Sequence, residues 1–283
     1  MGSGKKNVGL TIVKWTALAV FLVSSSVLGW QLYTDYKDNE NYDTMATEFV
    51  DEVEEEIIIV ENADETEEEG DSEPTVVSYV HKKVDLQSLH AKNAEAIGWI
   101  SIAGTPVNYA VMQAGNNDKY LNLSATGGRS AAGAIFADAK CGFSPQDTNV
   151  TLYGHNMGRG KTTMFSSLLN YGKQSYYNAH PYIQFDTIYG TGVWKIFSAF
   201  QVDVMNTTYN YSQRQFLNKN GFDEFVATGK SMSYVSTDIT PRYGDKTLVL
   251  STCDRSKNGA NGRFIVMAVL VGGTLMGSPA PVN

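Results

Sequence analysis

The chain has 283 residues, with 30 Asp+Glu against 22 Lys+Arg and only two cysteines. This length allows one large domain or two small ones. The hydrophobic content of 42% and the aromatic content of 11% exclude a wholly disordered protein. Two cysteines exclude a disulfide-rich secreted scaffold, and the Cys and His spacings of a zinc cage are absent from the sequence.

The net charge of −8 averages over three segments of different character. Residues 1–34 contain three lysines and no acidic residue, whereas residues 35–74 contain 18 acidic residues and a single basic one. Residues 75–283 contain 18 basic and 12 acidic residues. The sequence therefore predicts an N-terminal segment, an acidic connector over residues 34–74 and a basic head over residues 75–283.

The stretch from Leu10 to Tyr33 is apolar, and its only charge is Lys14. As a helix it would extend over about 36 Å, which exceeds the roughly 30 Å of a bilayer's hydrocarbon core. Trp15 and Trp30 lie near its two ends, where aromatic side chains favour the membrane interface. Lysines precede the stretch and acids follow it. We therefore predict a single-pass signal anchor over 10–33, with residues 1–9 cytoplasmic and the head extracellular.

A cleaved signal peptide is the alternative, because Ser24–Ser26 are small enough for a cleavage site. The apolar stretch continues past these serines through Val27, Leu28 and Trp30, which is longer than a usual signal-peptide core and favours the uncleaved anchor. The head is exported in either case.

The acidic segment over residues 34–74 predicts an extended, solvated spacer, since dense like charge repels itself. The apolar run Ile57–Val60 interrupts it and is suited to pairing as a strand or contacting the head. A chain that starts near Thr75 is therefore expected to be soluble and active.

The head alternates short β-branched and aromatic runs with turn residues, which is typical of an all-β barrel or sandwich with helical insertions. The pattern predicts helices over 85–96, 163–171 and 212–230. It predicts strands over Trp99–Ile102, Pro106–Met112, Gly133–Phe136, Asn149–Tyr153, Tyr182–Thr187, Gly192–Asp203, Lys246–Ser251 and Arg263–Val271.

Three residues with catalytic chemistry lie at predicted strand ends. Cys253 follows one strand, Arg263 opens the next strand, and His155 follows an earlier one. Adjacent antiparallel strands would bring Cys253 and Arg263 side by side. A thiolate nucleophile, an imidazolium that protonates the leaving amine and a guanidinium that stabilises an oxyanion are what cysteine-based acyl transfer requires.

Each of these residues also has an ordinary structural interpretation. A cysteine in a β-rich core is more often a small buried hydrophobe. A histidine beside Gly154 is suited to a turn, and an arginine at a strand start is usually a solvated charge. The spacing alone leaves both interpretations open.

The motifs TLYGHNM, Met164–Phe165–Ser166, LSTCD and RFIV together resemble the signature of the sortases, membrane-anchored cysteine transpeptidases of Gram-positive bacteria. The segments NAEAIGWISIAGTPVNYAVMQAGNNDKYL and GAIFAD resemble class B. The resemblance covers residues 85–271. It implies a mainly β fold, the eight-stranded sortase β-barrel with an N-terminal helix and a helical insertion before the Cys-bearing strand.

The same resemblance implies that Cys253 is the nucleophile, His155 the general acid and base, and Arg263 the residue that binds the oxyanion or positions the substrate. Ser251 and Thr252, next to the nucleophile, are candidates for lining the substrate groove.

Four further polar residues have weaker signals. Asp254 is a candidate for supporting the site from behind, and Asn156 for orienting His155. Among the other histidines, His81, His90 and His180 are predicted to be surface or loop residues. Cys141 lies in a polar loop and is predicted to be an incidental surface thiol, since a disulfide with Cys253 would block the nucleophile.

The reaction implied by the resemblance is transpeptidation, with cleavage after Thr in a C-terminal sorting signal similar to NPQTN or NPKTG on an exported surface protein. The acceptor amine comes from the peptidoglycan precursor in wall-anchoring members and from a pilin lysine in pilus-building members; wall anchoring is favoured. The sequence contains no phosphate loop, metal cage or dinucleotide fingerprint, so no cofactor and no metal are expected. Its basic residues are scattered, which argues against nucleic acid as a partner.

Two other classes remain open. One is a different wall-acting cysteine peptidase or transpeptidase, although papain-like chains place Cys before His and L,D-transpeptidases carry a Gly that LSTCD lacks. The other is a membrane-tethered binding module on a degenerate sortase fold, which is disfavoured because all three catalytic positions are filled.

Overall fold

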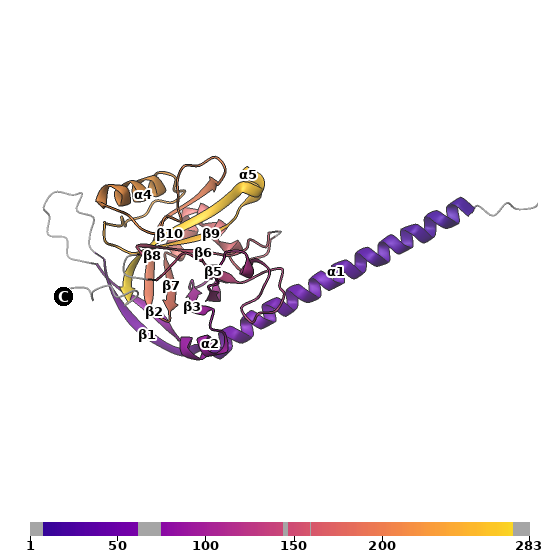
Figure 1. The fold of residues 1–283 in the computed structure, drawn as a ribbon, viewed down its shortest axis with the longest axis horizontal. Coiled ribbons are helices and arrows are strands. Elements are labelled where there is room, and N and C mark those ends of the chain that lie inside the picture. Colours follow the sequence, from indigo (N-terminus) through magenta and orange to yellow (C-terminus); the bar gives the residue numbers. More distant parts are fainter. Residues whose placement is uncertain (1–7, 62–74, 144–146, 159, 274–283) are drawn as a thin grey trace, which may run out of the picture.

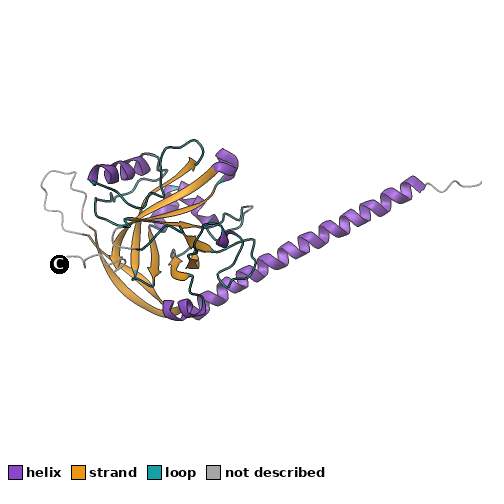
Figure 2. Cartoon of the chain, viewed as in Figure 1, coloured by secondary structure: helices purple, strands orange, loops and turns teal. Residues whose placement is uncertain are grey.

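The computed structural model describes residues 8–61, 75–143, 147–158 and 160–273. Its centre is a closed barrel of eight strands in the order β10-β8-β7-β3-β4-β5-β6-β9 (Figures 1 and 2). The barrel strands are β3 Ala96–Ser101, β4 Asn108–Met112, β5 Ile135–Ala137, β6 Asn149–Tyr153, β7 Tyr182–Thr187, β8 Gly192–Asp203, β9 Thr247–Cys253 and β10 Gly262–Gly273. The expected mainly β, eight-stranded barrel is confirmed.

The barrel strands are buried along most of their length because both of their faces are covered. The interior is filled by large apolar side chains such as Ile100, Phe185 and Trp194, none of which is exposed. A second apolar cluster lies outside β8, β9 and β10, where Phe222 and Phe225 of helix α4 (Lys219–Ser231) pack. Helix α4 is the helical insertion expected before the Cys-bearing strand.

The helices are shorter than the sequence pattern predicts. The helix expected over 212–230 begins at Lys219, because Asn218 caps it by accepting a hydrogen bond from the backbone N–H of Gly221 at 3.0 Å. The remaining elements are α2 Leu86–Lys92, α3 Gln174–Ala179 and α5 Arg255–Asn258, with 3-10 helices at Lys119–Leu121, Ser166–Gly172 and Gly259–Asn261. The predicted helix over 163–171 is therefore a 3-10 helix, and the one over 85–96 ends early because Ala96 enters β3.

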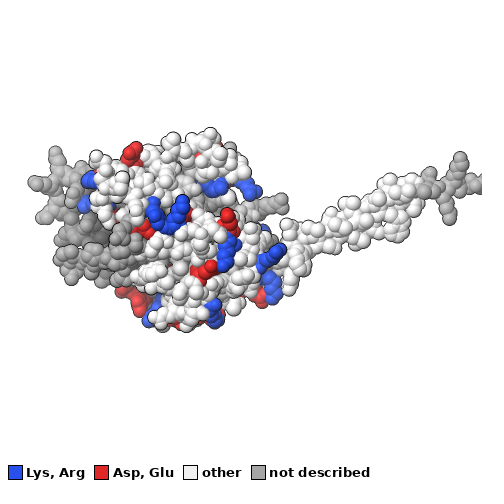
Figure 3. All heavy atoms as spheres, in the orientation of Figure 1, with Lys and Arg blue, Asp and Glu red and all other residues white. Residues whose placement is uncertain are grey.

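Helix α1 (Val8–Phe49) projects from the barrel and is long and apolar enough to cross a membrane by length and composition (Figure 1). Charged side chains of both signs lie interspersed over the head in Figure 3, whereas the projecting part of α1 is white in this view. The helix extends well beyond the expected span of 10–33, and its last turns pack on the head through Tyr42, Met45 and Phe49, which are all buried.

The first part of the acidic segment differs from the expected extended spacer. Strand β1 (Val50–Glu61) pairs antiparallel with β2 (Thr75–Val84), and the hairpin lies against the barrel (Figure 1). Ile59 is completely buried beside Val193 of β8. The charge count concealed this contact, because a strand places apolar and charged residues on opposite faces. The apolar run thus contacts the head; residues 62–74 lie outside the described residues.

Candidate active site

Three neighbouring barrel strands bring the candidate catalytic residues to one end of the barrel. Strand β9 pairs in parallel with β6, with Tyr153 opposite Ser251, and antiparallel with β10, with Arg263 directly opposite Cys253. Continuing the β6–β9 register by two residues places His155 beside Cys253. Directly opposed residues in an antiparallel pair carry their side chains on the same face. Cys253 is therefore central, with His155 on one side and Arg263 on the other.

Two glycines make this close approach of the strands sterically possible. A Cβ atom at Gly154, which precedes His155, would lie 2.4 Å from Cδ1 of Ile135. A Cβ atom at Gly262, which precedes Arg263, would lie 1.9 Å from the carbonyl oxygen of Asp254. Both distances are far inside van der Waals contact, so only glycine fits at these positions.

The ring of His155 is held by a backbone carbonyl. Its Nε2 atom lies 2.8 Å from the carbonyl oxygen of Leu121. A carbonyl oxygen only accepts hydrogen bonds, so Nε2 carries the proton in the neutral ring, and Nδ1 is the nitrogen that exchanges protons with reacting groups. The sequence offered no signal for this partner, since Leu121 is 34 positions earlier and contributes only its backbone.

Asn156 connects the His-bearing and Cys-bearing segments rather than orienting the imidazole. Its Nδ2 donates to the carbonyl oxygen of Cys253 at 2.8 Å, and its Oδ1 accepts from the backbone N–H of Gly158 at 2.9 Å. The backbone of His155 is also fixed, because its carbonyl oxygen accepts from the N–H of Phe165 at 3.0 Å. The described hydrogen bonds thus hold both sides of the His155–Cys253 pair by the backbone.

Arg263 is partly exposed, and its described hydrogen bonds use one terminal nitrogen. Nη1 donates to the carbonyl oxygens of Ala260 at 3.0 Å and Gly262 at 2.9 Å. A guanidinium has five N–H donors in a fixed plane. Fixing Nη1 therefore orients the fork while Nε and Nη2 keep donors that suit a substrate carbonyl or oxyanion.

Ser251 and Thr252, the candidates for lining the groove, are each only 2% exposed. The hydroxyl of Thr252 donates to the carbonyl oxygen of Gly154 at 2.8 Å. This bond connects β9 to the residue before His155, so Thr252 supports the histidine segment. Asp254 likewise acts locally, since its Oδ1 accepts from the backbone N–H of Ser256 and caps α5.

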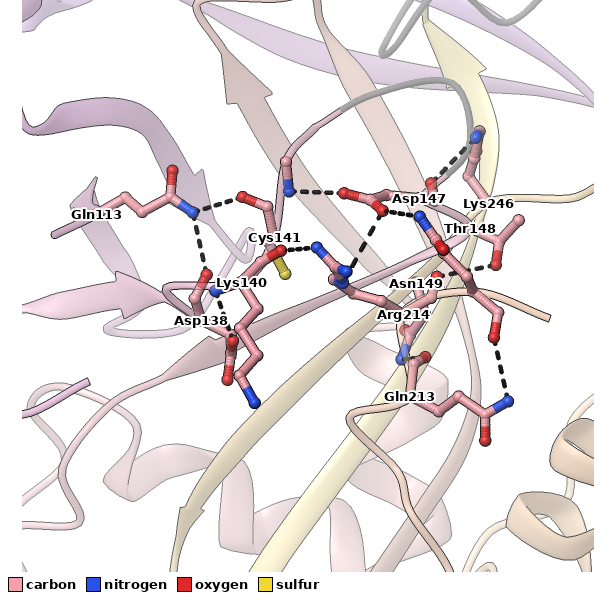
Figure 4. A network of polar contacts seen from close by, with 12 residues as sticks. Gln113, Asp138, Lys140, Cys141, Asp147, Thr148, Asn149, Gln213, Arg214 and Lys246 are labelled. Carbon is pink, nitrogen blue, oxygen red and sulfur yellow. Dashed lines mark hydrogen bonds and ion pairs between the residues drawn. The ribbon is translucent and has the colours of Figure 1, made fainter. Parts of the chain in front are cut away.

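Cys141 is a buried thiol rather than the expected surface thiol. It is 5% exposed, and burial raises the pKa of its thiol to about 11. Its carbonyl oxygen accepts from Nε2 of Gln113 at 2.7 Å (Figure 4). Both cysteines are free thiols. A neutral, buried thiol is a poor nucleophile, so Cys141 has none of the properties that the reaction requires.

The surroundings of Cys141 form a polar network at the end of the barrel where β6 and β9 begin (Figure 4). The carboxylate of Asp147, which is 1% exposed, accepts from the backbone N–H of Gly142 at 2.6 Å and from Nε2 of Gln215 at 2.9 Å. Arg214 donates to the carbonyl oxygen of Lys140. These bonds connect the loop before β6 with the segment before α4. They lie at the opposite strand ends from Cys253.

The other histidines have structural partners. His81 is buried, in contrast to the expected surface position, and its Nε2 lies 2.9–3.0 Å from the carboxylate oxygens of Asp186. His90 and His180 are partly exposed, and each places Nδ1 against a backbone carbonyl. Among the described residues no group of three or more His, Cys, Asp or Glu side chains could hold a metal ion.

Comparison with known proteins agrees with this geometry. Residues 100–271 match the family model described as the Sortase domain. The chain is 33% identical over 191 residues to Staphylococcus aureus sortase B, covering 68% of this chain and 76% of that protein. The structure of the S. aureus sortase B–substrate complex matches with a TM-score of 0.61 at 33% identity, covering 66% of this chain and 84% of that one. A Bacillus anthracis sortase B structure matches with a TM-score of 0.65 at 26% identity, covering 85% and 99%. The chain therefore belongs to the sortase family and is a class B sortase, a cysteine transpeptidase.

Proposed function

We propose that this class B sortase cleaves a C-terminal sorting signal similar to NPQTN or NPKTG after Thr and transfers the acyl group to an amine of the cell-wall precursor. Cys253 is the nucleophile, His155 the general acid and base, and Arg263 the oxyanion-binding residue. The observation that carries these roles is the register of β6, β9 and β10, which places Cys253 between His155 and Arg263.

The first half-reaction forms a thioester. The Cys253 thiolate attacks the carbonyl carbon of the Thr residue, and the electron pair moves onto oxygen. As the tetrahedral intermediate collapses, the C–N bond breaks and Nδ1–H of the His155 imidazolium protonates the leaving amine. Because the Nε2–H of His155 is held by Leu121, the neutral ring that remains is the Nε2–H tautomer.

The second half-reaction transfers the acyl group. An acceptor amine attacks the thioester carbonyl, Nδ1 of His155 takes the proton that the amine loses, and the Cys253 thiolate leaves. In both steps negative charge develops on the carbonyl oxygen, and the guanidinium of Arg263 lies on the correct side of Cys253 to stabilise it. Atoms and charges balance with no cofactor.

Two related structures support a peptide substrate and an amine acceptor. One S. aureus sortase B structure is a substrate complex, and another sortase B structure from the same organism is a complex with triglycine; a glycine peptide presents a primary amine. A pilin lysine as acceptor is the second candidate, because its ε-amine has the same chemistry. Membrane tethering by α1, with the N-terminus cytoplasmic and the catalytic head extracellular, follows from the apolar stretch and its flanking charges.

A peptide assay tests this function directly. The full-length chain in detergent is incubated with NPQTN and NPKTG peptides, with or without triglycine or a lysine-containing pilin peptide, and the products are identified by mass spectrometry. We expect cleavage after Thr and a product joined to the added amine, both abolished in Cys253→Ala. Cleavage that persists in Cys253→Ala, or products that never incorporate an amine, would refute the proposal.

A further inference from the structure

Helix α1 contacts the loop that supports the catalytic histidine. In the last turns of α1, Asp38 and Tyr42 are buried. The Ser130 hydroxyl donates to Oδ2 of Asp38 at 2.6 Å, and the Tyr42 hydroxyl donates to the carbonyl oxygen of Gly133. Both contacts reach the 119–134 loop, which connects the 3-10 helix Lys119–Leu121 to β5. The N-terminal helix therefore binds this loop through two buried polar contacts one helical turn apart.

The two arms of the 119–134 loop are bonded to each other on both sides of Leu121. The N–H of Ser130 donates to the carbonyl oxygen of Asn122 at 3.1 Å, and the N–H of Ala134 donates to that of Tyr120 at 3.0 Å. The carbonyl between them, that of Leu121, lies 2.8 Å from Nε2 of His155. The arm that α1 holds thus fixes the residues on each side of the carbonyl that orients the imidazole.

A second chain of contacts runs from α1 to the backbone of the same histidine. The ring of Tyr42 packs edge-on against Tyr109, with ring centroids 5.4 Å apart. The Tyr109 hydroxyl accepts from the N–H of Met164 at 2.9 Å, and the next N–H, that of Phe165, donates to the carbonyl oxygen of His155. Met164 has a φ of 54°, a strained conformation for a residue with a side chain, so this turn depends on its contacts.

We propose that Asp38 and Tyr42 are positioning residues for the transpeptidation reaction, through which the membrane-proximal end of α1 holds His155 in its Nε2–H tautomer. The inference rests on the proposed role of His155. It makes the helix that carries the anchor a part of the active site's support, acting through the Leu121 carbonyl rather than by touching substrate.

The test uses the full-length chain in detergent, and all rates are normalised to the fraction of sites titrated by a thiol reagent. The variants are Asp38→Ala, Tyr42→Phe and the double variant. Glu40→Ala and Tyr36→Phe are matched controls, since both residues lie exposed on the same helix. Asp38→Asn is the conservative rescue, because an amide oxygen still accepts from Ser130. We expect the double variant to lower kcat about tenfold, as loss of buried hydrogen bonds allows, with KM within about twofold. The controls and Asp38→Asn should stay within about twofold of wild type.

A second measurement reports on the histidine itself. Nitrogen NMR of chain labelled with 15N-histidine, with His155 assigned by its loss in His155→Gln, distinguishes the two neutral tautomers. We expect Nε2–H alone in wild type and the controls, and a mixture in the double variant. An unchanged kcat, or a reduced kcat with an unchanged tautomer, would overturn the inference. Failure of the proposed function is distinguishable, since cleavage would then survive His155→Gln and Cys253→Ala, while the tautomer still reports whether α1 holds the ring.

Discussion

Asn156 donates a hydrogen bond from Nδ2 to the carbonyl oxygen of Cys253 at 2.8 Å. The bond joins the residue after the catalytic histidine to the backbone of the nucleophile, 97 positions apart. It holds the two segments together beyond the last paired residues of β6 and β9, where the barrel's own ladder has ended. The relative position of His155 and Cys253 therefore depends on one side-chain amide.

Replacing Asn156 tests that dependence. In Asn156→Ala the Cys253 carbonyl loses a partly buried donor, which costs about 1–3 kcal/mol. We expect peptide cleavage to slow by about tenfold or more. Asn206→Ala is the control, because its amide bonds only to Asp203 in an exposed turn. Equal rates in both variants, measured by steady-state cleavage, would show that the bond is dispensable.

The two thiols should differ sharply in reactivity. At neutral pH, iodoacetamide should alkylate Cys253 and leave Cys141 unmodified, because Cys141 is buried and its pKa is raised to about 11. Intact-mass measurement should show one adduct in wild type and none in Cys253→Ala until denaturant is added. Cys141→Ala should keep most of its activity. Comparable alkylation of both cysteines in the native chain would contradict the burial of Cys141.

The raised pKa of Cys141 also predicts a pH dependence of stability. The fold favours the neutral thiol, so its contribution is fully present below the ordinary pKa of 9.0 and is lost as pH rises toward the folded value of about 11. The difference in unfolding free energy between wild type and Cys141→Ala should fall by about 2 kcal/mol between about pH 8 and pH 11. Urea unfolding of both chains at the two pH values measures it. A constant difference would show that the thiol titrates normally.

Arg263→Lys keeps the positive charge but loses the planar fork of donors. If Arg263 binds the oxyanion, this change should cost about 2–4 kcal/mol of barrier, as loss of an oxyanion donor typically does. Alkylation of Cys253 forms no oxyanion and should change far less. Arg255→Lys, at an exposed position on α5, is the matched control. If Arg263→Lys suppressed alkylation and turnover equally, Arg263 would be tuning the thiolate instead.

The packing of α1 and β1 revises the expectation that a chain starting near Thr75 is fully active. A chain starting at Thr34 retains Asp38, Tyr42 and the hairpin, and we expect its cleavage rate to match full length within about twofold, because every described contact of the head is kept. A chain starting at Thr75 loses the buried residues Tyr42, Met45 and Phe49. At about 1.5–3 kcal/mol for each buried side chain, it should unfold at clearly lower temperature and cleave more slowly. Equal melting temperatures and rates for the two chains would refute this.

The sequence by itself determined the barrel and the three candidate catalytic residues. Strand bounds over Asn149–Tyr153, Tyr182–Thr187 and Gly192–Asp203 agree with the structure, because β-branched and aromatic runs ended by turn residues are local signals. His155, Cys253 and Arg263 were identified because each lies in a short motif at a strand end.

Only the tertiary structure decided what surrounds these residues. The Leu121 carbonyl that orients His155 has no side-chain signature, and Cys141 lies in a polar stretch but is covered by residues distant in sequence. The buried side chains of α1 and β1 were concealed by the acidic charge of their segments. Net charge averages over all faces of a helix or strand, whereas packing depends on one face alone, and only the fold shows which face meets the barrel.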